Sequence, residues 1–225
     1  MGCGSMGTMH SAGVGNFITL EGIEGSGKTL QLSLLKEELD ARGAKFVTTR
    51  EPGGTHFGQE LRQILLHRDG SGREPLAELL LYLADRFQHL KEVIEPALSS
   101  GLHVICDRYH DATLAYQGYA RGLGFEIVDQ LSIILKLPMP MVTLILDLDV
   151  EVGLQRACQR NLEEEKESLG RFEAEDLSFH QRVREGYQLL ARREPNRIIL
   201  VDGSGAAEEV FPRILGILDE RGLCR

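Results

Sequence analysis

The sequence predicts an α/β protein in three layers, a five-stranded parallel sheet flanked by helices. Five short runs are rich in β-branched and other apolar residues. Most are apolar throughout rather than alternating, which is typical of parallel strands that are covered on both faces. Segments of helical length separate these runs. No repeat and no domain-sized linker interrupts the 225 residues, so we expect one folded domain.

The expected strands and helices alternate along the chain. Strands are expected at residues 16–21, 45–50, 103–108, 141–148 and 197–202. Helices are expected near residues 28–42, 58–67, 75–99, 125–137, 150–161, 173–193 and 206–221. The segment 75–99 shows the signal well, because it starts with Pro75 and keeps an apolar period close to 3.6. Ligands of such sheets bind at the carboxyl ends of the strands.

Composition argues against several classes of protein. An apolar content of 42% and a charged content of 26% are ordinary for a soluble globular protein. The net charge of −9 argues against nucleic acid as a partner, and no apolar run approaches the ~20 residues that span a membrane. The four cysteines show neither a zinc spacing nor a disulfide framework, so we expect reduced thiols in the cytoplasm.

The first fifteen residues, "MGCGSMGTMHSAGVG", lack both an apolar signal core and a helical period. Their start resembles a myristoylation site, but Met6 stands where Ser or Thr is expected. We therefore expect residues 1–15 to be a disordered leader, native or left over from expression, and residues 16–225 to form the domain.

The stretch "GIEGSGKT" fits the phosphate-binding pattern G-x-x-x-x-G-K-[ST] between an expected strand and an expected helix. Its residues are Gly22, Ile23, Glu24, Gly25, Ser26, Gly27, Lys28 and Thr29. Glycines let consecutive N–H groups face an anion at the start of a helix. Lys28 would then reach the β- and γ-phosphates, and the Thr29 hydroxyl would bind magnesium. A glycine-rich turn with a surface lysine is the alternative; the context favours an ATP site.

Two further stretches are expected at the same edge of the sheet. "TREPGGT" closes the second strand with a tight turn, which brings Glu51 and then Arg62 near this edge. In "LYLADRFQH", Tyr82 and Arg86 are four residues apart, so a ring and a guanidinium share one helix face. A tyrosine in a helix is also commonly half-buried packing.

A third stretch, "CDRYHDATLAYQG", leaves the third strand with Asp107 and Arg108 at its start. Such a pair could hold a metal-bound water with the carboxylate and a transferring phosphoryl group with the guanidinium. A structural ion pair at a strand end is the alternative.

In this order, these stretches resemble the thymidylate kinase family. The matching pieces are "FITLEGIEGSGKT", "TREPGGT", "DRYHDATLAYQGYARGLG" and "RFEAEDLSFHQRVREGYQLLA", within residues 16–218. The resemblance implies a P-loop kinase fold, a homodimer and transfer of the γ-phosphoryl group of ATP to thymidine monophosphate (dTMP), with magnesium. The product would be the diphosphate, a precursor of dTTP. Another nucleoside-monophosphate or deoxynucleoside kinase is the main alternative; a P-loop protein that only binds ATP is the other.

The resemblance also implies roles for individual residues. The acceptor site would comprise Glu51, Arg62, Tyr82, Arg86, Arg108, Thr113 and Gln117. Within it Tyr82 would stack on thymine, while Arg62 and Arg108 would hold the acceptor phosphate. Thr29 and Asp107 would lie at the magnesium ion.

The implied catalytic residues are Glu24, Lys28, Arg108, Arg156 and Arg160. Glu24 would lie near the deoxyribose 3′-hydroxyl and the reacting phosphates.

The charged stretch at about 156–176 resembles the mobile lid of this family. Some members carry a basic residue within the P-loop, where this chain has Gly25, so a lid arginine is expected to supply that charge. Arg156 and Arg160 are favoured as donor-phosphate contacts, with Arg171 at the far hinge. A solvated segment of mixed charge is the alternative reading of this stretch.

Overall fold

A computed structural model describes residues 15–67, 72–163, 171–172 and 174–223. Five parallel strands form one sheet with the order β2-β3-β1-β4-β5. They are β1 (Phe17–Gly22), β2 (Phe46–Arg50), β3 (His103–Asp107), β4 (Val142–Asp147) and β5 (Ile198–Asp202). Each begins and ends within one residue of its expected position, so the predicted fold class and strands are confirmed.

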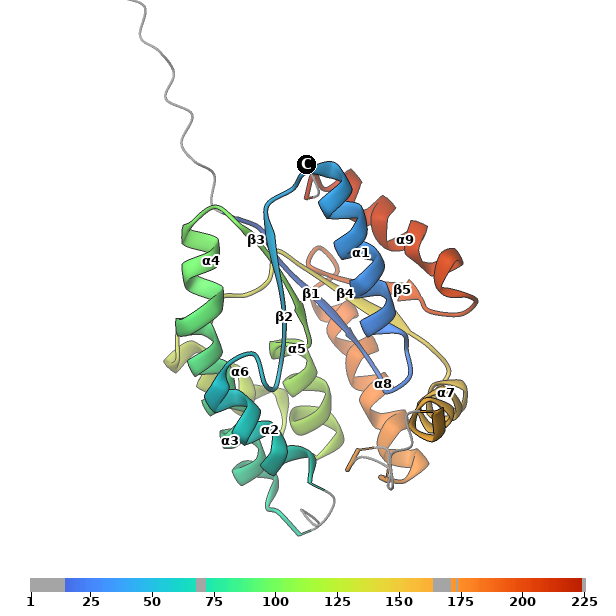
Figure 1. Cartoon of the computed structure of the whole chain (residues 1–225). Coiled ribbons are helices and arrows are strands. Elements are labelled where there is room, and N and C mark those ends of the chain that lie inside the picture. The colour runs from blue at the N-terminus through green and yellow to red at the C-terminus, as the bar shows by residue number, and fades with distance from the viewer. Residues whose placement is uncertain (1–14, 68–71, 164–170, 173, 224–225) are drawn as a thin grey trace, which may run out of the picture.

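Helices lie on both faces of the sheet (Figure 1). They are α1 (Lys28–Arg42), α2 (His56–Leu66), α3 (Pro75–His89), α4 (Glu95–Ser99), α5 (His110–Thr113), α6 (Phe125–Ile134), α7 (Val150–Glu163), α8 (Leu177–Arg193) and α9 (Ala207–Glu220). The segment expected as one helix at 75–99 is helical throughout, with a π-helical turn, η2 (Leu90–Ile94), between α3 and α4. α8 begins four residues later than expected, where the Asp176 carboxylate accepts from the Phe179 amide at 2.7 Å.

The helical segment at 110–120 was not predicted from the sequence. It consists of α5 and a π-helical continuation, η3 (Leu114–Ala120). η3 packs against α3, α6 and α8, and six of its seven residues are buried. A helix that is covered nearly all round shows no amphipathic period, which is why the pattern gave no helical signal here.

Two apolar clusters explain why the strands read as apolar throughout. On one face Leu35 and Leu39 of α1 pack with Ile214 and Leu218 of α9 over the sheet. On the other face the cluster joins α3, η3, α6 and α8. Figure 1 shows α1 and α9 side by side on their face. The sheet is therefore buried on both sides, and its carboxyl edge is left to hold the site.

Backbone geometry at this edge is set by a few residues with positive φ. Gly22, Gly25 and Gly27 have φ of 140°, 69° and 92°, which lets the loop between β1 and α1 wrap tightly. Arg108 has φ of 68°, which is uncommon for a residue with a side chain and turns the chain sharply after β3.

Candidate active site

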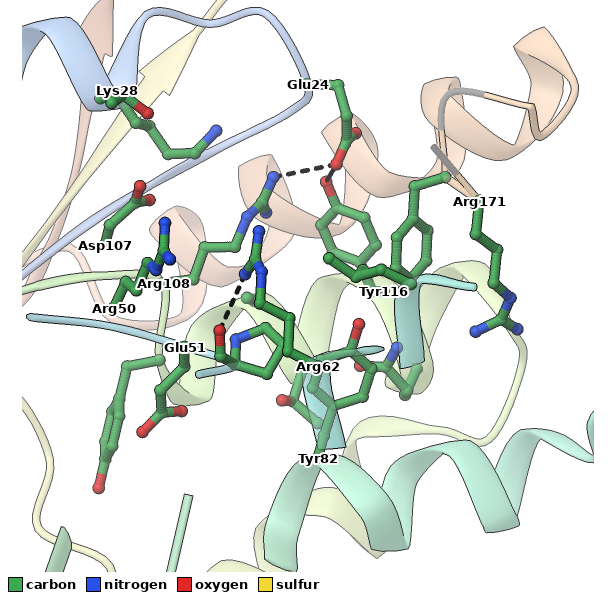
Figure 2. A pocket seen from close by; sticks show the side chains of 18 of the residues that line it. Glu24, Lys28, Arg50, Glu51, Arg62, Tyr82, Asp107, Arg108, Tyr116 and Arg171 are labelled. Carbon is green, nitrogen blue, oxygen red and sulfur yellow. Dashed lines mark hydrogen bonds and ion pairs between the residues drawn. The ribbon is translucent and has the colours of Figure 1, made fainter. Parts of the chain in front are cut away.

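A cavity of about 570 Å³ opens at the carboxyl ends of β1, β2 and β3. Thirteen of the predicted site residues line it: Glu24, Gly25, Lys28, Thr29, Glu51, Arg62, Tyr82, Arg86, Asp107, Arg108, Thr113, Gln117 and Arg160. Nine further lining residues had no predicted role: Arg50, Pro52, Leu66, His67, Tyr109, Ala112, Tyr116, Asn161 and Phe172. Figure 2 shows Lys28 and Glu24 at one end of this cavity and Tyr82 at the other, with Arg62 and Arg108 between them.

The Lys28 side chain is held inside the P-loop. Its ammonium donates to the carbonyl oxygens of Gly22 at 3.0 Å and Ile23 at 2.8 Å, and to the Ser26 hydroxyl at 3.1 Å. Burial, together with the nearby charge of Arg108, lowers the pKa of Lys28 to about 8. The loop therefore presents a partly desolvated cation in the position where the pattern predicts phosphate contacts.

Glu24 is the point at which the P-loop meets the loop after β3 (Figure 2). Its Oε1 accepts from Nη2 of Arg108 at 3.0 Å and from the Tyr116 hydroxyl at 2.8 Å. Nδ1 of His180 lies 3.6 Å from its Oε2. Burial alone would raise the pKa of Glu24, but Arg108 and these neighbours outweigh burial and lower it to about 2. Glu24 is therefore an ionised acceptor at neutral pH.

Both carboxylate oxygens of Glu51 have hydrogen-bond partners within the protein. Its two carboxylate oxygens accept from Nε of Arg86 at 2.7 Å and contact Nδ1 of His89 at 2.8 Å. Nη2 of Arg86 donates to the Tyr109 carbonyl at 2.8 Å, whereas the buried Nη1 has no partner among the described residues. The geometry places Glu51 behind Arg86, so any effect on a ligand would pass through that guanidinium.

The side chains of Gln117 and Arg171 both contact the carboxylate of Glu78 on α3. Nε2 of Gln117 donates to Oε1 of Glu78 at 2.7 Å, and Nη2 of Arg171 contacts Oε2 of the same carboxylate. Nη1 of Arg171 donates to the Leu65 carbonyl at 3.2 Å. Arg171, predicted at the far hinge of the lid, thus ties the chain before α8 to α2 and α3 at the cavity wall.

Arginines give the middle of the cavity its charge. Arg50, Arg62 and Arg108 all line it, and burial together with the charges of Arg50 and Arg108 lowers the pKa of Arg62. Like charges this close repel one another unless an anion lies among them, so the cluster suits a phosphate group. Oδ1 of Asp107, at the end of β3, is buried without a hydrogen-bond partner in the described structure.

Arg156 does not reach this cavity. It lines a second one, of about 610 Å³, at the ends of β4 and β5, and its Nη2 donates to the Gly205 carbonyl at 3.2 Å. The P-loop lies against α7 here, because a Cβ on Gly25 would lie 1.9 Å from the Gly153 carbonyl oxygen. Of the predicted lid, residues 164–170 and residue 173 lie outside the described part of the chain, as do residues 1–14 of the expected leader.

Other expectations concern cysteines, membranes and metals. Cys106 and Cys158, the two cysteines in the described ranges, carry free thiols. No helix within those ranges combines the length and apolarity needed to cross a bilayer. Nor do those ranges contain a group of three or more His, Cys, Asp or Glu side chains arranged to hold a metal ion by themselves.

Comparisons with known proteins show the family of this chain. The family model described as thymidylate kinase matches residues 20–214. A thymidylate kinase of Desulfosudis oleivorans is 51% identical over 90% of this chain and 96% of its own length. One of Syntrophotalea carbinolica is 53% identical over 88% of this chain and 92% of its own. The crystal structure of thymidylate kinase from Ehrlichia chaffeensis superposes with a TM-score of 0.73 at 33% identity, covering 91% of this chain and 98% of that one. With the P-loop, the arginine cluster and the Tyr82 end of the cavity in one continuous site, the chain belongs to the thymidylate kinase family.

Proposed function

We propose that the cavity lined by Lys28 and Tyr82 is where this chain transfers the γ-phosphoryl group of ATP to dTMP. The enzyme makes thymidine diphosphate, and nothing favours an alternative acceptor. One observation carries the assignment of the cavity: it runs from the P-loop lysine, past Arg62 and Arg108, to Tyr82 on α3 (Figure 2). A P-loop protein that only binds ATP needs no second, arginine-lined half of this kind.

The acceptor nucleotide would lie with its phosphate among Arg62 and Arg108. Tyr82, which is 9% exposed, offers a ring for the thymine. The unpartnered Nη1 of Arg86 and the carboxamide of Gln117 offer polar groups at the same end. The ionised Glu24 can accept a hydrogen bond from the deoxyribose 3′-hydroxyl.

The donor would approach from the other side of the P-loop. The loop N–H groups and the start of α1 suit the triphosphate, and the second cavity next to α7 offers room for its nucleoside. The Arg156 guanidinium, which lines that cavity, is a planar cation able to stack on a base. The two nucleotides would then meet end to end beside Glu24 and Lys28.

Transfer needs alignment and neutralised charge more than covalent help. An oxygen of the acceptor phosphate attacks the γ-phosphorus, and the bond to the β-phosphate oxygen breaks. Lys28 would exchange loop oxygens for phosphate oxygens and follow the migrating group. Arg108, fixed by Glu24 at 3.0 Å, would offset the repulsion between the two anionic substrates.

We infer a magnesium ion from the kinase chemistry and from two side chains at this edge. The Oδ1 atom of Asp107 is buried without a hydrogen-bond partner among the described residues, which suits a cation, and Thr29 lines the same cavity. When bound, the ion would neutralise charge on the β- and γ-phosphate oxygens. With only two protein groups available, substrate phosphates and water would complete its ligands.

We also infer a homodimer in the cytoplasm. Leu76, Leu80 and Phe87 form an exposed apolar row on α3, and Ile133 and Ile134 of α6 are 75% and 72% exposed. Figure 1 shows α3 and α6 on the same side of the sheet. Exposed apolar side chains gathered in this way favour a subunit interface. The unpaired thiols suit a reducing compartment, and nucleic acid and membrane are not expected as partners.

A coupled assay of ADP release tests the reaction. The full-length protein would be given ATP with dTMP, dUMP, dCMP, AMP, GMP or thymidine in turn. Preferred turnover of dTMP supports the proposal, while preference for another monophosphate or for thymidine would indicate a different kinase. Binding of ATP without turnover of any acceptor would indicate a regulatory protein.

A further inference from the structure

A continuous row of hydrogen bonds lies under the acceptor end of the cavity. It consists of Thr49, His89, Glu51 and Arg86, and we call it the Thr49–Arg86 row. Thr49 Oγ1 lies 2.6 Å from Nε2 of His89, and the Glu51 carboxylate bridges Nδ1 of His89 and Nε of Arg86 at 2.8 and 2.7 Å. His89 is 0% exposed, Glu51 3% and Arg86 1%. The row joins β2, the turn that follows it and α3.

The carboxylate fixes the direction of the two bonds that Glu51 makes. A carboxylate can only accept, so Nδ1 of His89 carries the proton that Glu51 receives. In the neutral ring Nε2 is then the acceptor for the Thr49 hydroxyl. Each member of the row is thereby satisfied except Arg86, which lines the cavity and whose buried Nη1 has no hydrogen-bond partner among the described residues. An unpaired charged donor in this place calls for an acceptor atom from a ligand.

The imidazole also has no freedom to move. A Cβ added to Gly54 would lie 2.4 Å from Cδ2 and Nε2 of His89, so the turn after β2 is packed directly on the ring. Asp85 secures the same turn, because its Oδ1 accepts from the Gly53 amide at 3.0 Å. His89 therefore meets Glu51 in one orientation.

We propose that His89 is a positioning residue which, through Glu51, aims the free Nη1 of Arg86 at the acceptor base. Without a donor at Nδ1, Glu51 can rotate into a two-oxygen contact along the Nε–Nη2 edge of Arg86. That edge already serves the Tyr109 carbonyl, so the guanidinium turns and Nη1 loses its direction. The inference rests on the proposed binding of dTMP in this cavity.

Two substitutions of the same residue separate this role from packing. The amide nitrogen of asparagine takes the place of Nδ1 and can still donate to Glu51, whereas that of glutamine takes the place of Nε2 and cannot. We expect His89→Gln to raise KM for dTMP about 10-fold or more, with kcat and KM for ATP changed much less. His89→Asn should retain most of the affinity. Gln88→Ala, on the neighbouring and more exposed position of α3, is the matched surface control.

A ligand without a base gives a second readout. Deoxyribose 5-phosphate, with binding measured by calorimetry, should bind the His89→Gln enzyme as it binds the wild type, because Arg86 would act at the base. Should His89→Gln not fold, Glu51→Gln replaces it, since one amide oxygen cannot serve both Arg86 and His89. The same selective loss of dTMP affinity is expected there.

Three results would overturn the proposal. The first is a wild-type KM for dTMP in His89→Gln or in its replacement Glu51→Gln. The second is equal loss in His89→Gln and His89→Asn together with an equal fall in Tm, which would make the ring a packing element. The third is a parallel loss of deoxyribose 5-phosphate binding. Failure of the proposed function itself is recognised separately, because the wild type would then not phosphorylate dTMP.

Discussion

Arg156 and Arg160 lie one turn apart on α7 but line different cavities. Arg160 lines the cavity that holds Lys28, Glu24 and Arg108, whereas Arg156 lines the second cavity and donates to the Gly205 carbonyl at 3.2 Å. The P-loop residue Gly25 lies against this same helix. The start of the lid thus reaches both sides of the P-loop, and its two arginines are expected to serve different parts of the donor.

The two lid arginines therefore predict different kinetic defects. Arg160→Ala should lower kcat by roughly 10²-fold or more, because the lost charge faces the reacting phosphates. Arg156→Ala should mainly raise KM for ATP, because this guanidinium lies in the cavity assigned to the nucleoside. Steady-state kinetics with each substrate varied distinguish the two. Normal turnover in both variants would mean that Arg108 and Arg171 supply the positive charge at the reacting phosphates. The lid would then cover the site without contributing a catalytic residue.

Lys28→Ala should abolish most turnover while leaving dTMP binding nearly intact. The ammonium lies inside the P-loop, and its contribution grows as charge moves toward the β-phosphate oxygen, so a loss of roughly 10²–10³-fold in kcat is expected. Lys36→Ala, at an exposed position of the same helix, is the control. Near-normal turnover of Lys28→Ala would refute the assignment of the P-loop as the donor site.

Gln117→Ala should weaken dTMP binding and reduce the preference for dTMP over dCMP. The side chain lines the cavity, and its amide bonds Glu78 at 2.7 Å, so alanine removes a polar contact and leaves a buried carboxylate oxygen with one donor fewer. A change of this kind costs ~1–3 kcal/mol, which is about 5- to 150-fold in affinity. Tyr119→Phe, in the same helical segment but outside the cavity lining, is the control. Unchanged affinity for dTMP and unchanged preference over dCMP would move the base pocket elsewhere.

The fold and the ends of the strands were predictable because the signals are local. Apolar runs, turn glycines and the P-loop spacing each lie within a few neighbouring residues. The resemblance to the family then predicted most of the residues that line the cavity. Tyr116 stands in the quoted stretch "DATLAYQG" beside Gln117, yet its bond to Glu24 joins residues 92 positions apart. His89 and Glu51 are 38 positions apart, and no local pattern indicates such contacts.

Arg156 illustrates a further limit of sequence reasoning. The resemblance favours both Arg156 and Arg160 as donor-phosphate contacts, and residues at i and i+4 share a helix face. Which cavity each arginine lines depends on how α7 is placed against the P-loop. The spacing of the two residues carries no information about that placement. Tertiary packing therefore separates residues that the helical period groups together.

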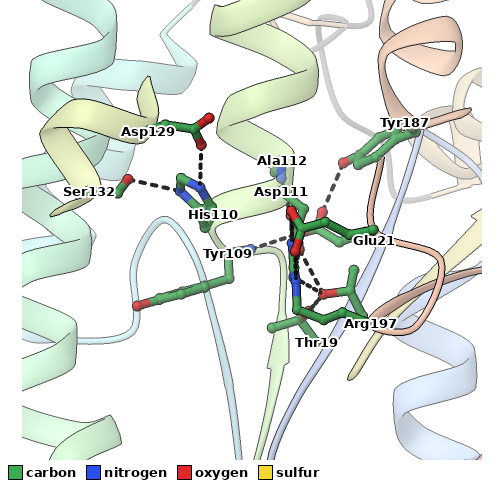
Figure 3. A network of polar contacts seen from close by, with 12 residues as sticks. Thr19, Glu21, Tyr109, His110, Asp111, Ala112, Asp129, Ser132, Tyr187 and Arg197 are labelled. Carbon is green, nitrogen blue, oxygen red and sulfur yellow. Dashed lines mark hydrogen bonds and ion pairs between the residues drawn. The ribbon is translucent and has the colours of Figure 1, made fainter. Parts of the chain in front are cut away.

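Glu21→Gln should change how stability depends on pH. Glu21 is fully buried and accepts from the Tyr109 amide at 2.8 Å, the Ala112 amide at 3.2 Å and the Tyr187 hydroxyl at 2.8 Å (Figure 3). Burial is the main cause that raises its pKa from 4.5 to about 7, with Arg108 opposing and Asp111 adding to the rise. The native state thus retains a proton that the unfolded chain has already lost.

The sign of the effect follows from this difference. Between pH 4.5 and pH 7 the unfolded state releases the proton and the native state does not, so this group lowers the free energy of unfolding as pH rises. The loss levels off above the native pKa at about 3 kcal/mol. Glutamine removes it, so Tm of Glu21→Gln relative to wild type should rise from pH 4.5 to pH 7. A constant difference in Tm across this range would contradict the raised pKa.

Gly25→Ala should destabilise the protein more than an alanine at another glycine with nearly the same φ. Gly25 has φ of 69°, and its added Cβ would lie 1.9 Å from the Gly153 carbonyl oxygen on α7. Gly43, which ends α1, has φ of 70° with nothing within 4 Å of an added Cβ. Gly43→Ala therefore measures the backbone cost alone, about 1–2 kcal/mol, while Gly25→Ala adds a displacement of α7. Urea unfolding of both variants gives the comparison. Equal losses in the free energy of unfolding would mean that α7 moves aside without cost and that a basic side chain could occupy position 25. A larger loss for Gly25→Ala would explain why a lid arginine has to supply the charge.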